Sequence, residues 1–195
     1  MPARPLTRHS RILMTYPPVP DDARAARTQR QIFEAFADLV QRERYDAFAV
    51  SDIVKEAGIG RSTFYEHFRD KDSVLRMSLR FPFGPLANLF FQEEAEERVV
   101  FALDHLWDRR ALARIILSEP TRSIAVQTLI DLAEEGASAR GLDPTHGPLR
   151  AEIAFKASGA IAALENWVTG RLQMTAEALA SSIFCHDQMR LSLAD

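Results

Sequence analysis

The sequence is poor in residues that cross-link chains or form sharp irregular turns: it has one cysteine, Cys185, and 8 glycines among 195 residues. One cysteine excludes a disulfide within the chain and makes a cysteine-based zinc site unexpected. This fits a reducing compartment. No apolar run approaches the roughly 18 residues of a membrane-spanning helix, and the N-terminal arginines precede no apolar segment of the kind found in a secretory signal. We therefore expect a cytoplasmic protein.

The sequence also lacks the short motifs that mark common enzyme active sites. Gly-x-Ser-x-Gly, His-Glu-x-x-His and Gly-x-x-x-x-Gly-Lys do not occur. Gly58 and Gly60 form a Gly-x-Gly pair, but the third glycine and the preceding strand of a dinucleotide site are missing. His105 stands between Asp104 and Leu106 and is not a metal site by itself. We predict a protein that is not an enzyme and that uses neither a cofactor nor a metal.

What the sequence has in abundance favours helices. It is 47% hydrophobic and 26% charged, enough to bury a sizeable core. Alanine, leucine, arginine and glutamate predominate and no long run alternates strictly, so the expected fold class is all-α. Residues 1–80 hold 14 Lys and Arg against 11 Asp and Glu, whereas residues 81–195 hold 10 against 16. This asymmetry suggests an anionic partner for the first part, with chance fluctuation an equal alternative from charge alone.

The apolar spacing divides the chain into a tail and two helical domains. Residues 1–22 hold five of the 10 prolines and are expected to be a flexible tail. An N-terminal domain over residues 23–72 begins with a helix in "DDARAARTQRQIFEAFADLVQRE", and residues 73–195 form a second domain. Apolar residues at helical spacing predict the buried face of the first helix: Ile32, Phe33, Phe36, Leu39 and Val40.

Two short helices follow, joined by a glycine-bearing turn. "VSDIVKEAG" predicts a helix with Ser51 as its N-cap and Gly58 in the left-handed conformation that ends it. Ile59 is expected to be buried at the centre of the turn. Phe64 and Phe68, four residues apart in the next helix, are expected to point into the core. Two short helices joined in this way, with polar side chains outward on the second, are typical of a helix-turn-helix DNA-binding unit.

The rest of the chain alternates between apolar helical spans and breaks. A fourth helix is capped by Asp70 or Asp72 and is predicted to end at "FPFGP" (81–85), because proline disfavours a helix interior. Breaks at "SEPT" and "GLDPTHGP" separate the later helices. These helices are expected near residues 87–107, 109–118, 124–139, 149–169 and 175–191. The prediction is a C-terminal helical bundle.

The chain resembles the tetracycline-repressor (TetR) family of transcriptional regulators, most closely over residues 28–80. The resemblance rests on residues whose spacing matches without a gap: Val50-Ser51, Ile53-Val54, Ala57-Gly58-Ile59, Thr63-Phe64-Tyr65, His67-Phe68 and Lys71. Gly60 departs from the family pattern, where a capping serine is usual, and Val54 stands where alanine is common. Weaker similarity extends to "ENWVTGRLQMTAEALA" (165–180), around the break between the last two helices.

The resemblance implies a homodimer whose recognition helices enter the major groove of a palindromic double-stranded DNA operator. Arg61 and Ser62 are then the candidates for base contacts, because arginine can bind guanine through two hydrogen bonds. Phosphate contacts would come from Ser51, Thr63, Tyr65, His67 and Lys71. Plainer alternatives are a solvated charge for Arg61 and packing for Tyr65 and His67. Ser51 is at least a cap and could be only that.

The resemblance also implies that the second domain forms the dimer and binds a small-molecule inducer. The helices near 149–169 and 175–191 would build the interface, through Ala157, Ala160, Leu164, Trp167, Leu179 and Ile183. A pocket among the middle helices would be lined by Phe91, Phe101, His105, Trp107, Ile116, Ile124 and Phe155. Packing within the monomer is the alternative for the interface residues, and an ordinary helical core is the favoured reading of each pocket residue.

The function expected from these features is repression relieved by a ligand. An activator, or an architectural or protein-interaction member of the same fold without an inducer, is the alternative. The intact Thr63-Phe64-Tyr65 and Lys71 argue against a DNA-binding unit that has lost its function.

Overall fold

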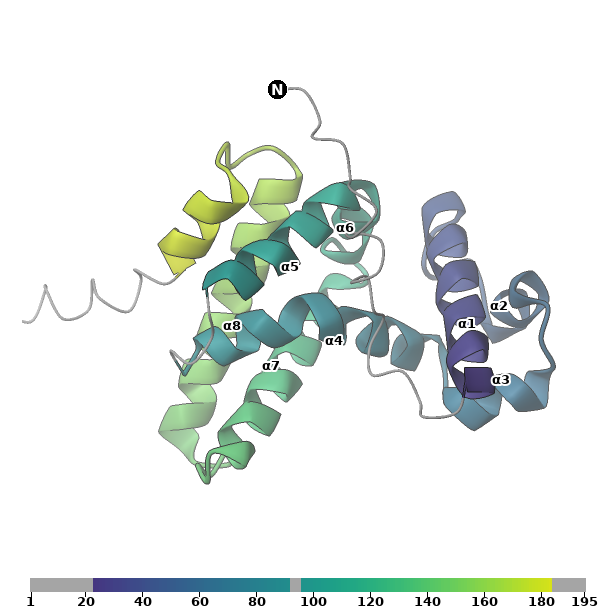
Figure 1. The fold of residues 1–195 in the computed structure, drawn as a ribbon, viewed down its shortest axis with the longest axis horizontal. Helices are drawn as coiled ribbons and strands as arrows, with labels where there is room; N and C mark the ends of the chain where they lie inside the picture. The colour runs from purple at the N-terminus through teal and green to yellow at the C-terminus, as the bar shows by residue number, and fades with distance from the viewer. Residues whose placement is uncertain (1–22, 92–95, 184–195) are drawn as a thin grey trace, which may run out of the picture.

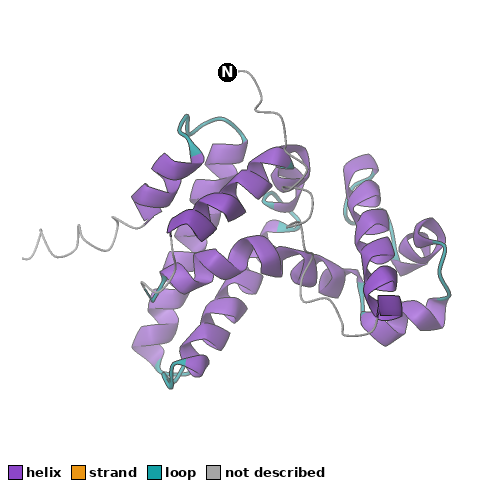
Figure 2. Ribbon diagram, viewed as in Figure 1, coloured by secondary structure: helices purple, strands orange, loops and turns teal. Residues whose placement is uncertain are grey.

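The computed structural model describes residues 23–91 and 96–183, where the regular structure is entirely helical (Figure 2), as the composition predicted. The labelled helices are α1 (Ala23–Arg42), α2 (Val50–Ala57), α3 (Arg61–His67), α4 (Lys71–Leu89), α5 (Glu96–Asp108), α6 (Arg110–Ile116), α7 (Arg122–Ala139) and α8 (Gly147–Val168). Residues 176–183 form a further helical segment. The predicted tail over residues 1–22 and the predicted helix beyond residue 183 lie outside the described residues. None of the described helices is long and apolar enough to cross a membrane.

The helices form two groups that α4 connects (Figure 1). α1, α2 and α3 pack together at one end, and α5 to α8 form a bundle at the other. α4 starts beside α3 and runs into the bundle, where it packs against α5 and α7. α1 also touches α6, so the two groups meet directly as well as through α4. The predicted domain boundary between residues 72 and 73 falls within the first turn of α4.

The apolar face predicted for the first helix is confirmed. Its five residues are each at most 3% exposed: Ile32, Phe33, Phe36, Leu39 and Val40. The ring of Phe33 meets Phe68 edge to face at 5.5 Å, and the ring of Phe36 meets Tyr45 and Phe48 at 6.3 and 6.0 Å. Such pairs add about 0.5–1.5 kcal/mol each beyond the burial of their area. An aromatic cluster thus joins α1 to α3 and to the loop between α1 and α2.

The prediction that the fourth helix ends at residues 81–85 is wrong. α4 continues through Pro82 and Pro85, although a proline in a helix interior removes a main-chain hydrogen bond and costs about 3 kcal/mol. Burial offsets this cost, because Phe83 is 0% and Leu86 is 1% exposed and each such side chain contributes roughly 1.5–3 kcal/mol. The helix predicted near residues 87–107 is correspondingly split between the end of α4 and α5.

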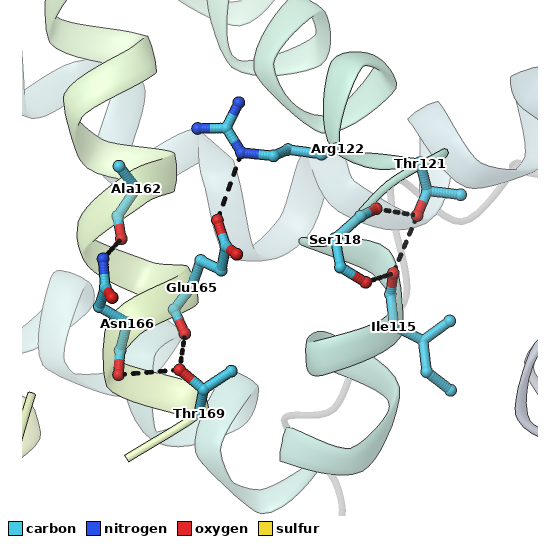
Figure 3. Close-up of polar contacts among 8 residues, drawn as sticks. All are labelled: Ile115, Ser118, Thr121, Arg122, Ala162, Glu165, Asn166 and Thr169. Carbon is cyan, nitrogen blue, oxygen red and sulfur yellow. Dashed lines mark hydrogen bonds and ion pairs between the residues drawn. The ribbon is translucent and has the colours of Figure 1, made fainter. Parts of the chain in front are cut away.

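Polar contacts anchor α6 to the bundle (Figure 3). The buried hydroxyl of Thr121 lies 2.9 and 3.0 Å from two carbonyl oxygens at the end of α6 and in the turn that follows it. Next to it, Arg122 Nε lies 3.3 Å from Glu165 Oε2 and ties α7 to α8. Arg114 Nε also donates to the Val168 carbonyl at 2.6 Å. α6 is therefore held firmly on its bundle side.

Candidate nucleic-acid interface

The start of α2 corrects the predicted cap. The N-cap residue is Ala49 and not Ser51, which lies exposed in the first turn. The Ala49 N–H donates to the Asp52 carboxylate at 2.8 Å, so the acidic side chain of the third helical residue pairs with the amide of the N-cap residue. Gly58 ends α2 in the left-handed conformation, with φ 65°, as predicted. The Ser51 hydroxyl remains at the surface.

The turn between α2 and α3 lies closer to the surface than predicted. Ile59 is half-buried, and packs against the edge of the core, where the sequence predicted full burial. Gly60 is the N-cap of α3, with φ −75° and ψ 151°, and no side chain caps this helix. A Cβ at Gly60 would meet Thr63 Oγ1 at 3.5 Å, an ordinary contact. The backbone therefore does not require glycine at this position.

The aromatic residues of α3 and its C-cap divide between core and surface as predicted. Phe64 is 0% and Phe68 is 4% exposed, whereas Tyr65 is 50% exposed. The Tyr65 ring rests edge-on against Phe64, with 5.5 Å between the ring centroids. Arg61 and Ser62 are also exposed. The outer edge of α3 therefore presents a guanidinium, a hydroxyl and a phenol, all of which can donate hydrogen bonds to bases or phosphates.

Thr63 and His67 are half-buried, but Lys71 differs from its predicted role. Its Nζ donates to the carbonyl oxygens of Tyr45 at 2.6 Å and of Phe48 at 2.8 Å. The same ammonium lies 4.5 and 4.9 Å from the centroids of these two rings, at cation–π distance. The Lys71 ammonium is therefore bound by carbonyl oxygens and aromatic rings of its own chain, whereas the sequence predicted that it contacts a phosphate.

Tyr45 and Asp72 complete this arrangement. The Tyr45 hydroxyl donates to Asp72 Oδ1 at 2.6 Å, and burial, followed by the neighbouring Asp72 carboxylate, raises the pKa of Tyr45. We call Tyr45, Phe48, Lys71 and Asp72 the α4 clamp, because they hold the start of α4 against the loop between α1 and α2. The sequence pattern did not predict this arrangement. The sequence did, however, contain a signal for it. The segment "RYDAF" interrupts the helical spacing of apolar residues, yet its two aromatic side chains are buried.

Replacing Lys71 with methionine is expected to lower the free energy of unfolding by about 1–3 kcal/mol, because two charge-assisted hydrogen bonds to carbonyl oxygens are lost. The slope of log affinity for DNA against log salt concentration should stay near that of the wild type, since no phosphate contact disappears. Urea denaturation and salt titration measure the two quantities. Arg61→Met, at an exposed site, serves as the control, with a stability change within about 0.5 kcal/mol. A smaller salt slope with an unchanged urea midpoint would restore the phosphate assignment.

Residues 32–76, from α1 to the first turns of α4, match the family described as bacterial regulatory proteins, tetR family. This segment of the chain belongs to the TetR family. Over 61 residues the chain is 39% identical to the HTH-type dhaKLM operon transcriptional activator DhaS of Lactococcus lactis subsp. lactis (strain IL1403). The matched segment covers 31% of this chain and 33% of that protein. Over 60 residues the chain is 33% identical to the uncharacterized HTH-type transcriptional regulator YxbF of Bacillus subtilis (strain 168). This matched segment covers 30% of the chain and 16% of that protein.

These matches span a third or less of the two curated relatives. A solved TetR transcriptional regulator from Streptococcus agalactiae 2603V extends the likeness over 84% of this chain and 94% of that one, with a TM-score of 0.51 and 25% identity. The similarity therefore includes the C-terminal bundle. The fold of the described chain is that of a TetR-family transcriptional regulator.

Within the described residues, those predicted to line a ligand pocket have different surroundings. His105 and Ile116 do line a cavity where α1, α4, α5 and α6 meet. Phe101 is 42% exposed and stacks edge-on against Phe81 of the cavity wall, at 6.1 Å between ring centroids. Three predicted residues thus lie in or beside one cavity.

The other four predicted pocket residues lie elsewhere. The Phe91 ring lies 4.7 Å from the Arg140 guanidinium, and Trp107 packs on the ring of Trp167 at 4.8 Å. Ile124 is partly buried against the core on α7. Phe155 is 63% exposed on α8, so it lines no enclosed space. Apolar character alone did not distinguish these sites from the cavity.

Most residues predicted for the dimer interface point into their own chain. Their exposed fractions are 0% for Ala157 and Leu164, 2% for Trp167 and Leu179, and 9% for Ala160, while Ile183 is half-buried. The first five therefore pack within the monomer, which is the alternative given above, and their place in a dimer interface stays a prediction. The opposite face of α8 is the one that remains available.

Proposed function

We propose that this regulator is a repressor that binds a palindromic operator as a homodimer and is released from it by a small molecule. The observation that carries the proposal is the outer edge of α3. Arg61 and Ser62 are exposed there and are assigned to base edges. Phosphate contacts are assigned to Ser51, Thr63, Tyr65 and His67. These contacts fix the register of α3 in the groove, and Arg61 supplies most of the preference for sequence.

The outer face of α8 supports the homodimer. Phe155 is 63% exposed, and Ala151, Ser158 and Gly159 are exposed at positions that share its face of the helix. A large exposed aromatic side chain among small residues is typical of a surface against which another helix packs. Two copies joined through this face and the segment at residues 176–183 would present two α3 helices to two half-sites about one turn of DNA apart.

The cavity between the two helix groups supports release by a ligand. A molecule bound there would contact α1 of the DNA-binding group and α6 of the bundle at once. The two helix groups can be arranged in a way that fits DNA or in a way that does not. The bound molecule causes release of DNA if it binds more tightly to the arrangement that does not fit DNA.

Activation is the second candidate, because the Lactococcus relative is by name an operon activator. A reporter gene placed downstream of the bound DNA site distinguishes repression from activation. Repression lowers expression when the protein is present, and the ligand restores it. Activation raises expression when the protein is present.

Selection of bound fragments from genomic DNA, followed by sequencing, tests the proposed function. We expect an enriched palindrome, and Arg61→Ala should lower affinity for it by about 1–3 kcal/mol and relax the preference at one position of each half-site. Arg171→Ala, at an exposed site outside the DNA-binding helices, is the control and should bind like the wild type. If the protein retains no DNA at low salt, where phosphate contacts are strongest, the proposal fails.

A further inference from the structure

A cavity of about 90 Å³ lies where the DNA-binding helices meet the bundle. Its walls are mostly apolar, and include Phe36 from α1, Leu79 and Phe81 from α4, and Ile116 from α6. For scale, a cavity of about 150 Å³ lined by aliphatic and aromatic side chains binds benzene. The space here therefore suits a smaller apolar group, of about four or five carbons.

A wider and more polar groove adjoins this cavity. It has a volume of about 470 Å³, lies between α1 and the start of α6, and shares Ala37, Arg109 and Leu112 with the cavity. Asp108 and Arg110 also line it, so two guanidinium groups face one carboxylate. Because the two spaces share a wall, a molecule whose apolar end fills the cavity would place its polar end in a groove of net positive charge.

Two polar side chains are available to a ligand: Arg109 lines both the cavity and the groove, and His105 lines the cavity. The His105 ring is half-buried and packs edge-on against Phe81, with 5.1 Å between ring centroids. Within the described part of the chain, neither His105 nor Arg109 makes a side-chain hydrogen bond or ion pair. Burial, and then the charge of Arg109, lowers the pKa of His105 to about 4, against a smaller opposing effect of Asp108. At neutral pH the imidazole is therefore uncharged and has an N–H group to donate.

We propose that the cavity and groove together bind a short-chain carboxylic acid, with its apolar end in the cavity and its carboxylate on Arg109 and His105. The guanidinium provides two parallel N–H groups that match a carboxylate, and the imidazole adds a third donor. Asp108 disfavours a second negative charge on the ligand, so a monoanion fits best. This assignment names the ligand class of the release mechanism and rests on the proposed function.

The position of the site explains how such a ligand would act on DNA binding. α1 supplies Phe33, Phe36 and Ala37 to the wall, whereas α6 is fastened to the bundle through Arg114 and Thr121. Filling the space therefore displaces α1 more readily than α6. Because α1 carries the aromatic cluster that holds α3, this displacement changes the orientation of the recognition helix.

Calorimetric titration of the full chain with 3-methylbutanoate tests the proposal, with 3-methylbutan-1-ol as an uncharged probe of the same carbon skeleton. We expect the acid to bind about tenfold or more tightly than the alcohol, because the carboxylate adds charge-assisted hydrogen bonds. Arg109→Gln should weaken binding of the acid by about tenfold or more and leave the alcohol unaffected. Arg171→Gln is the matched control, since Arg171 is an exposed arginine that lines neither the cavity nor the groove, and should change binding of the acid by less than about threefold.

A second variant tests the cavity without altering charge. Ala37 lines both the cavity and the groove. Ala37→Leu places a larger side chain in this space and should abolish binding of the acid. Ala37→Ser leaves the space open and should still bind the acid. Thermal unfolding shows whether each variant is folded. The proposal is overturned if the wild type binds none of the straight or branched acids of about three to six carbons, or if Arg109→Gln binds them as tightly as the wild type.

The failure of the proposed function would look different. The protein could bind the acid in the expected pattern and still keep its DNA when the acid is added. In that case the site would be present and the proposed release mechanism would be wrong. A protein that binds the acid and retains no DNA at low salt has the site without the regulatory function.

Discussion

Phe64→Ala is expected to lower the free energy of unfolding by about 3–5 kcal/mol and to abolish DNA binding. Phe64 is 0% exposed and its ring meets Phe68 at 5.9 Å. α3 has only 7 residues, far fewer than an isolated helix needs to be stable in water. Its position therefore depends on these buried rings, and a cavity at Phe64 removes the main anchor. Urea denaturation followed by circular dichroism measures the loss of stability, and retention of operator DNA measures the loss of function.

Tyr65→Ala is the matched control, because it removes the adjacent aromatic side chain, which is 50% exposed. Its stability should change by less than about 1 kcal/mol, while its affinity for DNA should fall through the loss of the proposed phosphate contact. The two variants together separate anchoring from contact. If Phe64→Ala unfolds at the same urea concentration as the wild type, Phe64 is not the anchor of α3.

Phe155→Glu is expected to convert the proposed dimer to a monomer, with a rise of about 100-fold or more in the dimer dissociation constant. Hot-spot aromatic residues at the centre of an interface contribute about 2–4 kcal/mol, and a glutamate on each copy adds repulsion between like charges. Because a monomer can occupy only one half-site, affinity for the full palindrome should fall as well. Sedimentation analysis over a range of concentrations measures the dissociation constant.

Leu142→Glu is the control for this experiment. Leu142 is 45% exposed in the loop between α7 and α8, so the substitution adds the same charge away from the proposed interface. It should leave both the dimer and DNA binding intact. A Phe155→Glu protein that still dimerises like the wild type would exclude the outer face of α8 as the interface.

The recognition helix was predictable because its determinants are close together in the sequence. Gly58, Phe64 and Phe68 lie within 11 positions of each other, and the separation of inward from outward side chains follows from the period of a helix alone. For the same reason the buried face of α1 was predicted correctly. The cap of α2 was misassigned by a small shift, since Ser51 and Asp52 are both acceptable near a helix start.

The roles of Lys71 and of the α8 residues were not predictable in this way. Lys71 binds carbonyl oxygens of residues 23 and 26 positions earlier in the chain, and no local pattern reports such a contact. Ala157 and Gly159 are neighbouring small residues on α8, yet one is fully buried and the other exposed. A stripe of small residues shows that something packs closely against a helix, and it does not say whether that is the same chain or a second copy.

The sequence by itself determined the first three helices, the glycine-bearing turn before α3, and the division between Phe64 inside and Tyr65 outside. These depend on periodicity and on the conformational limits of single residues, which act over a few positions. Only the tertiary structure decided that α4 runs on through Pro82, that Lys71 faces inward, and that a cavity opens between α1 and α6. These features depend on burial and contacts between segments far apart in the chain, whose energies exceed the local preferences that the sequence displays.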